Sequence, residues 1–392
     1  MWQRRLIPVI ICILLSTMLT GCWNRKELNA IGIVQGIGID KTPEGQIRIT
    51  FQVLKPSSKG GGKEGGSDKA VWVTTSVGAT IQDTVRNATK QSGRKFYVGH
   101  CKVIVIGEEV SREGIEQFVE IFQRDHEFRP DVLLFIARGK AQDVIEADNL
   151  QEKVPASGIA NLATATFATS NVPKVTLHDF AKTLASKTSA PFIPGIEVVE
   201  GKKDGKPIKV VQIDNTAVFK QDKLIGWLNK KEARGMLWLL GKVKSGTVVV
   251  NSPQDETQRV SLEIIRAASD VDVEVINNQI IMKVIIKEEG NLAEQASAVN
   301  LFTPDIIHEL EARKRAGIED EVNAALLKAQ QELDADVFKF GEEVHRRNPK
   351  LWKDLKKKWD QEFPKVLVKL MIEVRLNRIG LHKRPQTAEE EG

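Results

Sequence analysis

The first 22 residues constrain this chain more than any other segment, because they determine where the remainder folds. Arginines at positions 4 and 5 precede a 14-residue apolar run, 6–19, which ends in the sequence LTGC at 19–22. The run is short for a transmembrane helix but suits a signal-peptide core, and the arginines favour the cytoplasmic side. Small residues directly before a cysteine are the pattern of a lipobox, whose thiol accepts a diacylglycerol group. We therefore predict a lipoprotein signal peptide, 1–21, that is removed, and a mature chain lipidated at Cys22.

Lipidation at Cys22 predicts a body that is tethered to the outer face of the membrane. Two acyl chains give stable anchoring, and no uninterrupted stretch of 18 apolar residues follows the cysteine. The 392-residue chain has a formal net charge of +5, which falls to about +3 when the two early arginines are removed. With 41% hydrophobic and 28% charged residues, the composition excludes a disordered chain, a collagen-like fibre and a polytopic membrane protein. For such a near-neutral exported body we expect no nucleic-acid binding.

Patterns typical of catalytic and metal sites do not occur in the sequence. Of the three cysteines, Cys12 leaves with the signal peptide, Cys22 is lipidated and Cys101 stands alone, so no disulfide and no zinc site is expected. The six histidines show no paired ligand spacing, the serines show no GxSxG, and the glycines of 32–38 lack the GxGxxG order. The sequence RDHE at 124–127 concentrates titratable groups, but it is interpreted as a polar helix end. We predict no enzyme activity, no catalytic residue, no metal and no cofactor.

The periodicity of apolar residues predicts a mixed α/β (α+β) fold with several subdomains, each a mainly antiparallel sheet flanked by helices. Residues 31–39 and 46–54 are expected to form a hairpin in an N-terminal domain, 22–190. The glycine-rich segment 56–69 has no large apolar residue and is expected to be a flexible loop. Prolines and glycines in 191–207 predict a linker or domain boundary there.

A C-terminal α/β domain, 208–380, is expected to follow, and its division into two subdomains stays open. Alternating apolar residues around Asn277-Asn278 predict a tight hairpin. Apolar residues three and four positions apart from Ile318 to Val344 predict one long helix of about seven turns, packed on the C-terminal sheet. A last strand at 366–376 is expected to close this sheet, and 381–392 is expected to be a disordered tail.

One segment near the C-terminus is strongly basic. Between residues 346 and 358 the single acid Asp354 stands against seven basic residues, namely Arg346, Arg347, Lys350, Lys353, Lys356, Lys357 and Lys358. One interpretation is the solvated face of an amphipathic helix. The other is contact with anionic phospholipid headgroups or with an acidic partner surface, which a lipid tether would bring close.

Three groups of residues, taken in order, carry a resemblance to a known family. CWNRKEL at 22–28 is followed by GIGID at 36–40, and HCKVIVIGE at 100–108 is followed by RDHEFR at 124–129. Near the C-terminus, WDQEF at 359–363 precedes a strand that ends at Gly380. In this order and spacing the chain resembles the C subunits of spore germinant receptors, the GerAC-type lipoproteins of endospore-forming bacteria.

The resemblance implies a lipoprotein on the outer face of the spore inner membrane, with a mixed α/β fold in three subdomains and no enzymatic activity. It implies membrane-embedded A and B subunits as partners, in a receptor that senses nutrients and triggers germination. The B subunits resemble amino-acid transporters, so nutrient binding is expected there, and direct nutrient binding by this chain is not expected. Two alternatives stay open: a lipid-tethered solute-binding protein of a transporter, with two lobes around a cleft, and a cell-wall hydrolase.

Overall fold

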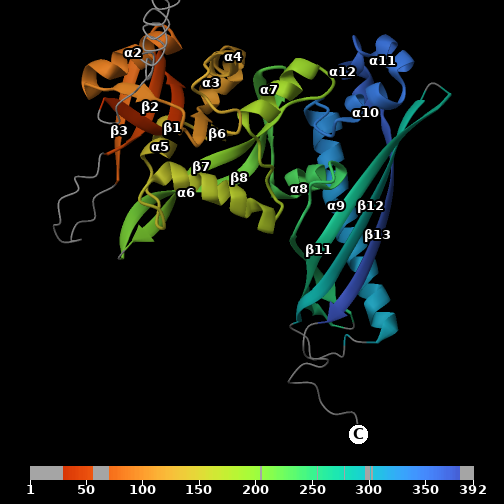
Figure 1. The fold of residues 1–392 in the computed structure, drawn as a ribbon. Coiled ribbons are helices and arrows are strands. Elements are labelled where there is room, and N and C mark those ends of the chain that lie inside the picture. The colour runs from red at the N-terminus through yellow and green to blue at the C-terminus, as the bar shows by residue number, and fades with distance from the viewer. Residues whose placement is uncertain are drawn as a thin grey trace, which may run out of the picture.

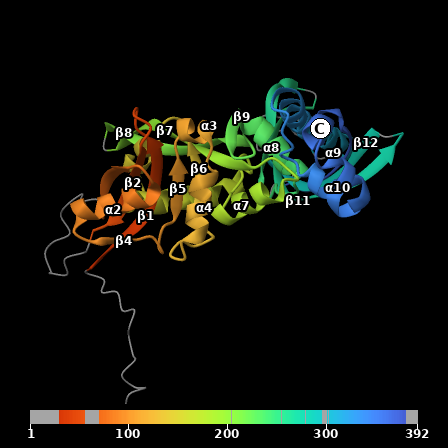
Figure 2. The same cartoon turned by 90° about the horizontal axis from the view of Figure 1, so that it is seen from above.

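The computed structural model describes residues 30–55, 70–203, 205–253, 255–277, 279–295, 301 and 303–379. Figures 1 and 2 show an elongated molecule with a nine-stranded sheet at one end and a four-stranded sheet at the other. The predicted signal peptide, Cys22, the glycine-rich segment 56–69 and the predicted tail 381–392 lie outside the described residues. The mixed α/β class is confirmed.

The larger sheet has the strand order β3-β2-β1-β5-β6-β7-β8-β9, with β4 paired to β1. The outer neighbours are antiparallel, including the predicted hairpin of β1 and β2, whereas β1, β5, β6 and β7 run parallel to one another. The prediction of a mainly antiparallel sheet is therefore wrong for its centre. Helices connect β5 to β6 and β6 to β7, and a strand that follows such a crossover runs parallel to the strand before it. The strands are β1 (Ile31–Lys41), β2 (Ile47–Leu54), β3 (Val71–Gly78), β4 (Lys95–Tyr97), β5 (Val103–Ile106), β6 (Leu133–Ala137), β7 (Phe192–Lys203), β8 (Lys206–Lys220) and β9 (Lys223–Leu228).

Helices cover both faces of this sheet. Successive side chains of β5 point to opposite faces and pack against different helices. Ile104 and Ile106 pack in the cluster that contains Phe118 of α4, whereas Val103 and Val105 pack in the cluster that contains Ile145 of α5. Each face of a strand takes every second side chain, so a short run of β-branched residues serves two cores. The helices are α2 (Ile81–Ser92), α3 (Glu108–Glu113), α4 (Glu116–Arg124), α5 (Ala141–Glu146), α6 (Pro155–Ala165), the 3-10 turn η1 (Thr166–Ala168) and α7 (Leu177–Ser186).

The segment 191–207 is not a linker. It forms β7 and the start of β8, which pair as an antiparallel hairpin and continue the large sheet across the predicted boundary. Its prolines are compatible with a strand because Pro194 lies at an irregularity in the pairing register and Pro207 lies at the second residue of β8. Turn-forming residue types therefore mark a bulge and a hairpin end within a continuous sheet.

The smaller sheet contains β10 (Gly246–Ser252), β11 (Asp255–Ile276), β12 (Gln279–Gln295) and β13 (Leu367–Ile379), in that order. Asn277 has a φ of 49°, as a tight hairpin between β11 and β12 requires, so that prediction is confirmed. β13 closes the sheet as expected, but it runs parallel to β12. The chain between them is helical, and such a crossover returns the next strand in the same direction.

The predicted seven-turn helix is two helices. α9 (Pro304–Leu327) continues into a π-helical turn, η2 (Lys328–Glu332), after which Asp334 and Lys339 adopt positive φ values of 47° and 64°. The chain then begins a new helix. The spacing of apolar residues continues across the break because both helices pack on the same core. The remaining helices are α8 (Lys230–Leu239), α10 (Phe340–Arg347), α11 (Pro349–Leu355), α12 (Trp359–Glu362) and the 3-10 turn η3 (Phe363–Lys365).

The packing of α9 on the C-terminal sheet is confirmed. Met282, Val284 and Ile286 alternate along one face of β12 and are fully buried, as are Ile318 and Val322 of α9. These residues belong to a continuous apolar core that also includes side chains of β1, α7 and α8. Among the described residues, no helix combines the length and the apolarity that crossing a bilayer requires.

Candidate functional site

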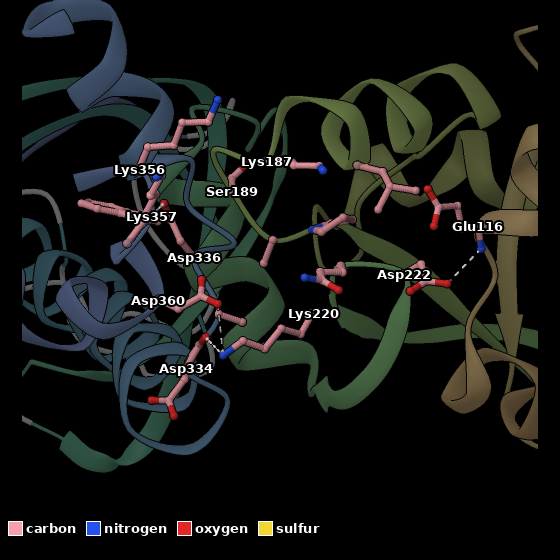
Figure 3. A pocket seen from close by; sticks show the side chains of 16 residues that line it. Glu116, Lys187, Ser189, Lys220, Asp222, Asp334, Asp336, Lys356, Lys357 and Asp360 are labelled. Carbon is pink, nitrogen blue, oxygen red and sulfur yellow. Dashed lines mark hydrogen bonds and ion pairs between the residues drawn. The ribbon is translucent and has the colours of Figure 1, made fainter. Parts of the chain in front are cut away.

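A cleft of about 320 Å³ lies where the large sheet meets the C-terminal helices (Figure 3). One side carries Glu116 of α4 and Asp222, which lies in the turn between β8 and β9. The opposite side carries the segment 334–336 and residues of the α11–α12 region, including Asp360. The cleft thus joins segments that are more than 200 residues apart in the sequence.

Asp336 is a buried residue at this junction, and its carboxylate holds several segments together. Oδ1 accepts hydrogen bonds from the backbone N–H groups of Phe338 and Phe340, both at 3.1 Å. Oδ2 accepts from the backbone N–H of Gly341 at 2.7 Å and from Nε1 of Trp359 at 3.1 Å. Burial raises the pKa of Asp336 to about 6, against the effect of these four donors. All its acceptor sites are in use, so the group organises α10 and α12 rather than a ligand.

The other charged groups of the cleft also join structural elements. Nζ of Lys220 donates to the backbone carbonyl oxygen of Asp334 at 3.3 Å and lies 3.5 Å from Oδ2 of Asp360. On the other side, Oδ2 of Asp222 accepts from the backbone N–H of Glu116 at 3.2 Å. These contacts connect β8 to the C-terminal helices and the β8–β9 turn to α4.

No catalytic arrangement results from these residues. Ser189 lines the cleft and its Oγ is buried with no hydrogen-bond partner among the described residues, but no histidine or cysteine is among the lining residues. A serine without a neighbouring base is not an activated nucleophile. Lys187, Lys356 and Lys357 stand at the rim without an ion-pair partner in the described part of the chain. The cleft is therefore a polar junction with free cationic groups at its edge.

Buried charges outside the cleft are structural as well. The carboxylate of Asp40, at the end of β1, accepts hydrogen bonds of 2.9 and 2.8 Å from the first two backbone N–H groups of α5, and desolvation raises its pKa. Arg234 of α8 pairs with Glu321 of α9, with 2.8 Å between Nε and Oε2, and Nε1 of Trp238 donates to the same carboxylate at 2.9 Å. Within the described ranges, no group of three or more metal-ligating side chains occurs.

The titratable sequence at 124–127 forms a polar helix end, as interpreted from the sequence. Arg124 pairs with Glu120 one turn earlier at 2.6 Å, and Oδ1 of Asp125 accepts from the backbone N–H of Glu127 at 2.9 Å. Cys101 is buried, and desolvation raises the pKa of its thiol to about 12. A buried thiol with a raised pKa is unreactive, so neither segment supplies a catalytic group.

The basic segment forms an exposed surface on α10, α11 and the turn before α12. All seven of its basic side chains are exposed, whereas Trp352, Leu355 and Trp359 point into the core. Asn348 caps α11 through a 3.1 Å hydrogen bond from the backbone N–H of Leu351, as its position before Pro349 predicts. This arrangement confirms the amphipathic-helix interpretation, and the second interpretation, a binding surface, stays a prediction.

Sequence reasoning missed the cleft itself, because its lining residues come from five separate segments. The one available signal was Asp336, which stands alone among the apolar residues of 335–338. A single acid in an apolar run indicates a buried carboxylate with several donors. The lysines at the rim carry no comparable signal, because exposed lysines occur throughout the chain.

Comparison with known proteins gives matches along nearly the whole chain. Residues 24–198 match the family described as spore germination protein N-terminal domain, and residues 214–380 match spore germination B3/GerAC like, C-terminal. The chain belongs to the GerAC-type family of germinant receptor C subunits. The resemblance found in the sequence motifs is thereby confirmed.

Curated members of the GerAC-type family align over nearly their full length. Spore germination protein KC of Bacillus subtilis (strain 168) is 27% identical over 400 residues, which cover 97% of this chain and 98% of that protein. Spore germination protein B3 of the same organism is 26% identical over 368 residues, with coverages of 92% and 95%. These relatives support a role for this chain in spore germination.

The fold agrees with a solved member of the GerAC-type family. The crystal structure of the GerBC protein superposes with a TM-score of 0.57 at 22% sequence identity, covering 87% of this chain and 96% of that chain. At this identity the likeness concerns the fold. It supports the arrangement of two sheets and flanking helices described above.

Proposed function

We propose that this protein is the lipid-anchored C subunit of a nutrient germinant receptor, required to trigger spore germination through assembly with membrane-embedded A and B subunits. The observation that carries the proposal is the match to both GerAC-type domains over nearly the whole chain. The location that follows is the outer face of the spore inner membrane. The protein would act through contacts with its partners and not through chemistry of its own.

Lipid anchoring rests on the LTGC sequence at 19–22. Ala30, the first described residue, follows Cys22 by eight positions and leads directly into β1, which lies within the large sheet. Eight residues span at most about 29 Å. A lipid on Cys22 would therefore hold the folded body close to the bilayer and raise its local concentration beside membrane-embedded partners.

A scaffolding role fits the distribution of polar groups. The buried carboxylates of Asp40, Asp336 and Glu321 each hold backbone groups or side chains of neighbouring elements, as described above. They stabilise the body and are not free for acid–base work. The continuous core from β1 to α12 also argues against the solute-binding alternative, which needs two lobes that move about a hinge.

Germination of three spore strains with two triggers tests the receptor role. The strains carry the intact gene, a deletion and Cys22→Ala, and the triggers are the cognate nutrient and an agent that activates cortex lysis directly. We expect the deletion to abolish the nutrient response and to leave the direct trigger effective, with partial or complete loss for Cys22→Ala. Equal failure with both triggers would place the protein in cortex hydrolysis or spore assembly and would contradict the proposal.

Metabolic labelling with a fatty acid tests the anchor separately. Label should be lost in Cys22→Ala and retained in Cys12→Ala, which removes the other cysteine of the N-terminal segment. Undiminished label on Cys22→Ala would exclude lipidation at this position.

A further inference from the structure

We propose that one end of the C-terminal half is a membrane-docking surface that binds anionic phospholipid headgroups and places a β-hairpin tip in the interface. This surface, here called the docking end, comprises five lysines of the α11–α12 region (Lys350, Lys353, Lys356, Lys357 and Lys358) and three apolar residues (Val275, Ile276 and Leu367). The inference rests on the proposed function in one respect, namely that the protein lies beside a membrane.

The lysines of the docking end are exposed and have no ion-pair partner among the residues that the structure describes. The acids around them are mostly engaged elsewhere: Asp360 lies 3.5 Å from Lys220, and Glu362 lies 3.2 Å from Lys365. Asp354 is the exposed acid that remains within 350–358. The surface therefore presents a net positive charge that no internal pair neutralises.

The apolar part of the docking end is the tip of the β11–β12 hairpin. Val275 and Ile276 are the last residues before the turn at Asn277, and their exposed fractions are 42% and 45%. Hairpin tips exposed to water are normally polar, so two β-branched apolar residues there are unusual. Leu367, at the start of β13, is 52% exposed and pairs in register with Ile281 of the same hairpin.

Contacts hold the hairpin tip and the basic helices together. Nε2 of Gln279, two residues beyond the turn, donates to the backbone carbonyl oxygen of Lys365 at 2.7 Å. Nε of Arg347, at the end of α10, lies 3.7 Å from Oδ1 of Asp272 in β11. Figure 1 shows α10, α11 and α12 beside the outer end of this hairpin. Charge and apolar tip thus belong to one end of the molecule.

The composition of the docking end favours a lipid surface over a protein partner. Lysine is depleted at protein interfaces, whose binding energy comes mainly from buried aromatic, apolar and arginine anchors. The basic helices offer no such anchor, because their large apolar side chains Trp352, Leu355 and Trp359 all point inward. Lysine ammonium groups suit a diffuse layer of anionic headgroups, and apolar side chains at a tip suit the headgroup–acyl boundary.

The docking end also agrees with the position of the predicted tether. Ile31, the first residue of β1, pairs in register with Lys95, three residues after the end of α2. Figure 1 places α2, α11, α12 and the tip of the β11–β12 hairpin toward the same edge of the molecule. A lipid near the start of β1 and headgroup contacts at α11 would therefore engage one bilayer from both ends of the body.

Vesicle cosedimentation tests the surface without partners or spores. The full mature chain carrying Cys22→Ala is mixed with vesicles of phosphatidylcholine alone or with 30% phosphatidylglycerol. We expect at least tenfold stronger partitioning onto the anionic vesicles, lost at high salt. Lys350→Glu/Lys353→Glu/Lys357→Glu should lower it at least tenfold, and Val275→Ser/Ile276→Ser at least threefold. Thermal melts check that both variants remain folded.

The matched control carries the same charge change at another exposed, lysine-rich hairpin. Lys202→Glu/Lys206→Glu/Lys209→Glu, on the β7–β8 hairpin, should leave partitioning within twofold of the unchanged chain. An equal loss in both triple variants would show that binding follows net charge and would overturn the docking surface. Absence of binding to anionic vesicles would overturn it as well.

Germination measurements separate this inference from the proposed function. If the deletion strain shows the nutrient-specific defect but vesicles are not bound, the receptor role stands and the docking surface is wrong. A second outcome also overturns the lipid proposal: vesicles are not bound, yet spores with Lys350→Glu/Lys353→Glu/Lys357→Glu lose the nutrient response. The lysines would then contact an acidic protein.

Discussion

Lys314 of α9 and Glu288 of β12 form an ion pair in which both side chains are fully buried, with 2.6 Å between Nζ and Oε1. Nζ also donates to the backbone carbonyl oxygen of Glu263 at 2.9 Å, whereas Oε2 of Glu288 has no hydrogen-bond partner among the described residues. Gly290 leaves the space for this contact, because a Cβ there would lie 2.1 Å from Nζ. Desolvation raises the pKa of Glu288 and lowers that of Lys314. The pair fixes the position of α9 on the sheet.

Lys314→Met should lower the free energy of unfolding by about 3–5 kcal/mol, because it leaves Glu288 buried without its cation. The double variant Lys314→Met/Glu288→Met should recover part of this loss, since no charge then stays buried. Urea unfolding of the mature chain measures both. As a control, Lys231→Met breaks an exposed pair with Asp320, also on α9, and should cost less than about 1 kcal/mol. A double variant less stable than Lys314→Met would contradict this account.

Asp336 should make stability fall as the pH rises. Its pKa in the folded protein, about 6, lies above the ordinary value of 3.8, so the folded state binds a proton more tightly than the unfolded chain between these values. The resulting stabilisation is complete below about pH 4 and is lost as the pH rises through 6, by about 3 kcal/mol. The variant Asp336→Asn does not titrate there. The unfolding free energy of the unchanged protein minus that of the variant should decrease between pH 4 and pH 7, and a constant or increasing difference would refute the assignment.

Gly235 permits the close crossing of α8 and α9. A Cβ at this position would lie 2.0 Å from the backbone carbonyl oxygen of Glu321 and 2.8 Å from Cβ of Ala325. Gly235→Ala should therefore lower the free energy of unfolding by about 3 kcal/mol, although alanine is the better helix former. Lys230→Ala, in the first turn of the same helix, should cost less than about 1 kcal/mol. Denaturant midpoints of the two variants make the comparison, and equal midpoints would show that the helices can separate freely.

Cys101 should be unreactive in the folded protein. Its side chain is buried and its pKa is raised to about 12, so little thiolate is present at pH 8 and the reagent has no access. In the mature chain with Cys22→Ala, Cys101 is the single thiol, and Ellman's reagent should label it at least a hundredfold more slowly than in guanidinium chloride. A positive control is Lys202→Cys in a Cys101→Ala background, which should react at once. Rapid labelling of the folded protein would mean that the segment around Cys101, just before β5, opens easily.

Local patterns predicted the helices and strands well and their continuity poorly. The spacing of Ile318, Val322 and Val344 correctly indicates which side chains are buried. It cannot reveal that the chain leaves the helix between η2 and α10, because two helices that pack on one core keep the same spacing of apolar residues. The positive φ of Asp334 and the capping carboxylate of Asp336 produce that break, and both act through contacts with distant segments.

The prolines of 191–207 give a similar lesson for domain boundaries. Pro194 and Pro207 are typical of a break in regular structure, yet here they lie in strands that join the sheet at a bulge and near a hairpin end. Whether such a residue ends an element depends on its neighbour in the sheet, which lies far away in the sequence. The parallel pairing of β6 with β7 supplies that neighbour.

The sequence by itself determined the mixed α/β class, the β11–β12 turn at Asn277 and the family, and its export signal with Cys22 stays a prediction. These depend on residues close together in the chain or on motifs in a set order. Only the tertiary structure decided the parallel centre of the large sheet, the cleft, the Lys314–Glu288 pair and the meeting of the basic helices with an apolar hairpin tip. Each of these brings together side chains far apart in sequence, and apolar periodicity reports that a residue is buried without reporting against which segment it packs.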